Sequence, residues 1–275
     1  MPAIDLTRLK EQSSKLIGYF DQPDAFLHHL ENLLEYYTNK TLRLNPVTLN
    51  TNLPSYKTPL PVMRQIESDL EKLGDQYPTS AVNLVIALWE ANYFEARLLS
   101  AFLLGTLQPG SAMNLFTKLP DWLYETRDQA IKKALLTSAL ARLRRENPQV
   151  LLMLISEWLQ APGPKTQTWG LHAFIPLIQL LGYNDLPQFF QILRPAIETV
   201  SPTTQPDIQD CIITLYSISP SETIHFITEI IQHSGNQERM QEFSRLFRGF
   251  PPEIQKELDL VVKQIRIPSP KIKQD

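Results

Sequence analysis

The sequence predicts an all-α fold, a right-handed α-solenoid of about six stacked helical hairpins. Apolar residues recur at three- and four-residue spacing along most of the chain, which is the spacing of one helix face. Valine and isoleucine follow the same spacing rather than the alternation of a strand, and the hairpin signals Asn-Gly and Asp-Gly are absent from the sequence. Hairpins that recur every 30–45 residues or so would stack to bury one continuous core.

Composition excludes several classes of protein. The 275 residues include 9 glycines and 22 prolines, a balance that disfavours nucleotide-binding folds built on glycine turns and suits helices that begin at proline. The phosphate-binding motifs GxGxxG and GxxxxGK do not occur. The single cysteine, Cys211, excludes an internal disulfide and a cysteine zinc site, and its apolar neighbours predict a buried, inert thiol.

Location and ligands follow from the same composition. The first residues alternate charged and apolar side chains, and no run of about 18 apolar residues follows them, so we expect a cytoplasmic protein with no membrane partner. The formal net charge of −3 makes no general case for nucleic acid, though it allows one basic face. The 5 histidines show no metal-ligand spacing, so we expect neither a metal nor a small-molecule cofactor.

Residues 1–40 are expected to form an N-terminal helical cap. Apolar residues at helical spacing predict one helix from Ile4 to Ile17 and another from Phe26 to Leu34. Residues 41–61, rich in Asn, Thr and Pro, show no sustained period and predict an irregular connection.

The rest of the chain is expected to hold the stacked hairpins, over residues 62–262, so that a single helical-repeat domain spans residues 1–262. Residues 263–275 lose the apolar period and are expected to form a flexible tail. The helix from Trp169 to Leu181 is apolar nearly all round, which predicts a central position, and Pro176 predicts a kink. Its one histidine, His172, is expected to be a core side chain.

The clearest hairpin lies between Leu84 and Leu107. Its second helix has Leu98, Ala101, Phe102 and Gly105 at helical spacing. Glu95 falls in the first turn of that helix, where an acid suits the positive end of the helix dipole. For Arg97, two residues on, a structural role in packing is favoured over a functional one.

Motifs around this hairpin carry a resemblance to a known family. They are Tyr-Lys-Thr-Pro at 56–59, Arg-Gln-Ile at 64–66, Leu-Trp-Glu at 88–90 and Tyr-Phe-Glu-Ala-Arg-Leu-Leu at 93–99. Together, over roughly residues 50–108, they resemble the opening of the HEAT-like DNA alkylation-repair glycosylases. The resemblance implies a solenoid of HEAT-like or armadillo-type repeats, with DNA or a protein partner on its concave face.

The resemblance also implies a chemistry. Aromatic faces hold a cationic alkylated base, and a carboxylate stabilises the positive charge that develops on the sugar. The family pattern is a tryptophan with an aspartate one helical turn later. Here Trp122 is followed four residues on by Thr126, and the nearest acids are Glu125 and Asp128. Either acid is a candidate, although Asp128 is better interpreted as the cap of the next helix.

Two further sets of residues are candidates. Trp169 stands where the family has a second aromatic residue, but Gly170-Leu171-His172 follow it in place of the family's Arg-Arg. The densest basic set could contact DNA phosphates, or could instead complement helix C-termini and stay solvated; it consists of Lys132, Lys133, Arg142, Arg144 and Arg145.

Two functions therefore remain open. The first is a non-catalytic helical-repeat binding or scaffold protein related to the DNA alkylation-repair proteins. The alternative is a DNA glycosylase that excises alkylated bases. The missing Trp-to-acid spacing favours the first, because the sequence offers no evident supplier for the charge stabilisation that excision requires.

Overall fold

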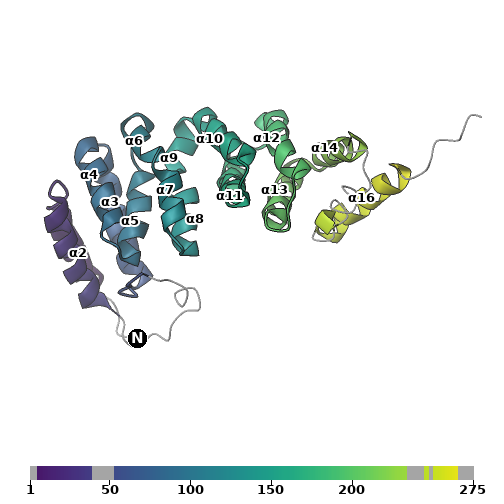
Figure 1. The fold of residues 1–275 in the computed structure, drawn as a ribbon. Helices are drawn as coiled ribbons and strands as arrows, with labels where there is room; N and C mark the ends of the chain where they lie inside the picture. Colours follow the sequence, from purple (N-terminus) through teal and green to yellow (C-terminus); the bar gives the residue numbers. More distant parts are fainter. Residues whose placement is uncertain (1–4, 39–52, 234–244, 248–249, 266–275) are drawn as a thin grey trace, which may run out of the picture. The chain divides into compact units, whose positions relative to one another are not determined.

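In a computed structural model of the protein, every regular element of the described residues is helical (Figure 1). The described residues are 5–38, 53–233, 245–247 and 250–265, and no strand occurs within these ranges. The predicted all-α class is therefore confirmed. Those parts of the expected elements that fall on residues 1–4, which include the predicted helix start at Ile4, and on residues 39–52, 234–244, 248–249 and 266–275 lie outside the described residues.

Contacts divide the chain into two compact units, residues 1–151 and 152–275. The helices that lie wholly in the first unit are α1 (Leu6–Ile17), α2 (Pro23–Tyr37), α3 (Leu60–Gly74), α4 (Pro78–Glu90), α5 (Phe94–Leu104), α6 (Pro109–Phe116), α7 (Leu119–Glu125), α8 (Gln129–Thr137) and α9 (Ala141–Glu146). The boundary falls inside α10 (Pro148–Gln160). The second unit contains α11 (Pro164–Leu181), the 3-10 turn η2 (Gly182–Asp185), α12 (Leu186–Glu198), α13 (Gln205–Ile218), α14 (Pro220–His233) and α16 (Pro252–Ile265).

Proline opens many of these helices. It occupies the first or second position of α2, α3, α4, α6, α7, α11, α12 and α13. Proline has no amide hydrogen to leave unbonded there, and its fixed φ suits a helix start. The sequence can therefore be both proline-rich and helical. Pro176 is different, because it lies inside α11.

Helices α4 and α5 form the hairpin predicted between Leu84 and Leu107, and they pack against each other. Asn92 makes the turn in the left-handed region, with φ of 56°, which asparagine tolerates better than most other residues. Buried Ser100 donates from Oγ to the carbonyl of Val85 at 2.8 Å. The two helices are thus joined at both their turn and their interface.

Helices α3 and α8 also pack on α5, which makes α5 central to the first unit. Gly105, at the end of α5, allows the end of α8 to pack closely against α5. A Cβ placed on Gly105 would lie 1.8 Å from the carbonyl oxygen of Ser138, just after α8. No side chain fits at that point.

The second unit is built around α11, which packs mainly against α13. The rings of Phe174 and Phe189 meet edge to face, with centroids 5.3 Å apart. Cys211 is buried as predicted, and burial raises the pKa of its thiol well above the ordinary value. The core prediction for His172 is wrong. The side chain is 45% exposed, and its Nε2 lies 2.8 Å from Oδ1 of Asp207, which links α11 to α13.

The described part of the chain contains neither a membrane-spanning helix nor a cluster of metal ligands. None of the helices there combines the length and apolar character that crossing a membrane requires. Nor do three or more His, Cys, Asp or Glu side chains gather there in a way that could hold a metal ion.

Candidate functional site

Two tryptophans from neighbouring parts of the first unit stack on each other. The rings of Trp89 in α4 and Trp122 in α7 lie 4.6 Å apart between centroids, with 17° between their planes. Only 4% of Trp89 and 6% of Trp122 is exposed. The sequence singled out Trp122 as a candidate to hold a base and did not predict that Trp89 would cover it.

Arg97 completes this cluster. Its guanidinium carbon lies 4.6 Å from the centroid of the Trp89 ring, a cation–π distance. Its Nε donates to the carbonyl of Trp89 at 3.3 Å, and its Nη2 donates to Oδ1 of Asn92 at 3.2 Å. Burial lowers the pKa of Arg97, and Glu125 opposes that shift. These contacts agree with the structural role expected for Arg97. They stabilise the turn of the α4–α5 hairpin, where packing was expected.

The two acidic candidates have different surroundings. Asp128 is 5% exposed and caps α8, because its Oδ1 accepts hydrogen bonds from the amides of Ala130 at 2.8 Å and Ile131 at 3.1 Å. The capping interpretation of Asp128 is confirmed. Glu125, the last residue of α7, is exposed and accepts a long hydrogen bond of 3.4 Å from Nε1 of Trp89.

Glu95 has a role that the sequence interpretation missed. It is only 3% exposed, and its carboxylate accepts hydrogen bonds from Oγ of Ser55 at 2.9 Å and from the amides of Tyr56 at 3.2 Å and Thr58 at 3.3 Å. The acid therefore fastens residues 55–58 to the start of α5. The sequence holds one signal for this contact. The Thr-Pro step at 58–59 is followed by a hairpin, α4–α5, whose second helix has a glutamate in its first turn.

A pocket of about 390 Å³ lies beside these residues. Its lining is mostly charged and polar and comprises Leu53, Arg97, Glu125, Thr126, Arg127 and Asp128. It brings together Glu125 and Asp128 from the predicted site. Trp122 does not line it, and Arg127 was not among the predicted residues.

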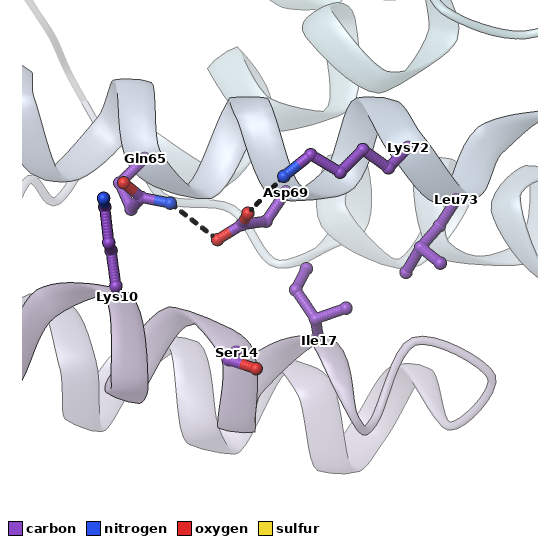
Figure 2. Close-up of a pocket in the computed structure, with 7 residues that line it drawn as sticks. All are labelled: Lys10, Ser14, Ile17, Gln65, Asp69, Lys72 and Leu73. Carbon is purple, nitrogen blue, oxygen red and sulfur yellow. Dashed lines mark hydrogen bonds and ion pairs between the residues drawn. The ribbon is translucent and has the colours of Figure 1, made fainter.

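A second cavity, of about 450 Å³, lies between α1 and α3 and contains no predicted site residue (Figure 2). Its central group is Asp69, which accepts hydrogen bonds from Gln65 at 2.8 Å and Ser13 at 2.7 Å and pairs with Lys72 at 3.1 Å. Burial alone would raise the pKa of Asp69, but these hydrogen bonds and the charge of Lys72 outweigh it and lower the pKa. Both carboxylate oxygens have partners, so Asp69 fastens α1 to α3 and leaves little chemistry to the cavity.

Trp169 belongs to the second unit. It lies in α11, is 4% exposed, and meets Trp158 edge to face with ring centroids 6.5 Å apart. Its neighbour Gly170 is packed tightly, because a Cβ there would lie 2.9 Å from a methyl group of Leu159. This tryptophan is therefore part of the packing between α10 and α11.

The five predicted basic residues divide by environment. Arg142 is engaged by Asp75, by Glu146 at 2.6 Å and by the carbonyl of Thr106 at 2.6 Å. Arg144 is half-buried and donates to the carbonyl of Thr137 at 2.6 Å, and burial together with Arg145 lowers its pKa. The remaining three have no ion pair with any described residue and are at least partly exposed; they are Lys132, Lys133 and Arg145.

The model of a family described as DNA alkylation repair enzyme matches residues 33–246, which is more than half of the chain. No curated protein and no solved structure matches the chain.

Proposed function

Since the chain belongs to the DNA alkylation repair enzyme family, we propose that it binds the phosphate backbone of DNA and does not excise alkylated bases. The stack of Trp89 on Trp122 carries this proposal. A site for a cationic alkylated base needs an aromatic face that the base can reach. Here the two rings cover each other, Arg97 lies over Trp89, and both tryptophan side chains are buried.

The carboxylates support the same proposal. Base release develops positive charge on the sugar, which an uncommitted carboxylate in a fixed position would stabilise. Asp128 instead uses Oδ1 to cap α8 and is almost fully buried. Glu125 lines the pocket but is exposed at the end of α7, and among the described residues its carboxylate is held only by the long hydrogen bond from Nε1 of Trp89.

The DNA-binding half of the proposal rests on the family and on the available cations. Lys132, Lys133 and Arg145 are free of ion pairs within the described part of the chain. Each phosphate that they neutralise would contribute a slope of about −0.9 to the dependence of log affinity on log salt concentration. Binding of this kind is weak at physiological salt and independent of sequence.

A base-release assay on a methylated duplex tests the absence of excision. We expect no release above a protein-free control. The matched variant is Asp128→Asn, because asparagine caps helices as well as aspartate does, so the variant keeps α8 capped but lacks the carboxylate. Release by the wild type that disappears in Asp128→Asn would establish a glycosylase and overturn the proposal.

A further inference from the structure

We propose that the pocket lined by Arg97 and Arg127 binds a phosphate group of the DNA backbone, with the two guanidinium groups as its donors. The inference rests on the proposed function, and it names the place on the first unit where a DNA strand would bind. Neither arginine belongs to the basic set that the sequence analysis selected.

Arg97 enters the pocket with hydrogen-bond donors to spare. A guanidinium has five N–H donors, and Arg97 uses Nε for Trp89 and Nη2 for Asn92. Among the described residues it has no other hydrogen bond and no carboxylate within ion-pair distance. Charges that are partly removed from water are normally paired. Glu125 offsets part of that cost from beyond ion-pair distance, so a direct acceptor for the remaining N–H donors of Arg97 is expected to come from outside the described chain.

Arg127 provides the second cation from an exposed position. It lies between Thr126 and Asp128, in the segment that joins α7 to α8. Within the described ranges it makes no hydrogen bond and no ion pair. The planar guanidinium matches two oxygens of a phosphate, which makes arginine well suited to this ligand.

The two carboxylates of the pocket oppose an anion less than their formal charges suggest. Asp128 accepts the amides of Ala130 and Ile131 in the first turn of α8, where the helix dipole offsets a negative charge. Glu125 accepts the indole N–H of Trp89 and is exposed, so that water and salt screen it. The acids therefore have donors already, whereas both arginines keep N–H donors for which no described residue is an acceptor.

The wall of the pocket is held before any ligand arrives. Leu53 lines it and precedes Pro54, whose carbonyl accepts the amide of Phe94 at 2.9 Å. The buried carboxylate of Glu95 then fixes residues 55–58. A preformed site loses less conformational freedom on binding than one that must be ordered.

The test is a titration of the full chain with a short unmodified DNA duplex at two salt concentrations. In Arg127→Gln the salt slope should become shallower by about one, as for the loss of one phosphate contact. Between about 50 and about 200 mM salt this removes roughly a threefold to fourfold change in affinity. Arg127→Lys, which keeps the charge, should retain the wild-type slope.

Arg8→Gln is the control, because Arg8 is also exposed in the first unit but does not line the pocket. If wild type binds with a salt slope and Arg127→Gln behaves like Arg8→Gln, the pocket assignment is wrong while the proposed function stands. If wild type binds no duplex at low salt, both fail. Inorganic phosphate that binds wild type but not Arg127→Gln, and leaves the duplex bound at constant ionic strength, would assign the pocket to free phosphate and contradict the backbone assignment.

Discussion

Glu95 shows how one buried carboxylate can hold a connection in place. Its two oxygens accept three hydrogen bonds from residues 55–58, and two of the donors are backbone amides. A buried amide without an acceptor loses its hydrogen bond to water and gains nothing in return. The carboxylate therefore stabilises the segment that walls the pocket.

Replacing Glu95 by alanine should destabilise the fold. The amides of Tyr56 and Thr58 would lose their acceptor, so we expect a loss of about 2–3 kcal/mol in the free energy of unfolding. Urea denaturation measures it, with Glu90→Ala as the control, because Glu90 is exposed at the end of α4. Equal midpoints for the two variants would show that residues 55–58 are held by something other than Glu95.

Single residues were predicted well where the cause is local and poorly where it is distant. The cap formed by Asp128 follows from its place just before a helix, and the buried thiol of Cys211 follows from its apolar neighbours. The contact of His172 with Asp207 and that of Glu95 with residues 55–58 join segments about 35 to 40 positions apart. No periodicity encodes such pairs.

At the scale of elements, apolar spacing located α5 but assigned its buried face only in part. The spacing selected Leu98 and Phe102, yet both are partly exposed, whereas Leu99 and Leu103 are fully buried. The reason is that α3, α4 and α8 all pack on α5, so that most of its circumference is covered. A helix buried on several sides has no single stripe for a period to reveal.

Gly105 is the position where α5 tolerates substitution least. In Gly105→Ala the new methyl group would meet the backbone carbonyl of Ser138, which cannot move aside as a flexible side chain can. We expect a destabilisation of at least about 1–3 kcal/mol, measured by urea denaturation.

Gly110→Ala is the matched control, since beyond its chain neighbours and the backbone of its own helix no described atom lies within 4 Å of a Cβ at that position of α6. Because alanine favours a helix more than glycine does, this variant should keep or gain up to about 1 kcal/mol. A Gly105→Ala protein as stable as Gly110→Ala would show that α5 does not end against the segment after α8.

For the whole molecule, the all-α class could be predicted from the sequence because it depends on a spacing that runs along the chain. The family could be predicted because its motifs are short and local, within roughly residues 50–108. The candidate site could be predicted only in part. Glu125 and Asp128 do line one pocket, but the partner of Trp122 is Trp89, contributed by a helix more than thirty residues earlier. That stack changes the functional conclusion, since it removes from solvent the ring that the resemblance would have used to hold a base.

The most direct measurement is a titration of the full chain with a methylated and an unmodified duplex of the same sequence, each at low and physiological salt. The account predicts equal affinities for the two duplexes, both falling by about one to two orders of magnitude as salt rises, because only phosphates are contacted. A preference of about tenfold or more for the methylated duplex would show that a base reaches an aromatic face, and would contradict the account. Failure to bind either duplex at low salt would contradict it too, and would favour a protein partner.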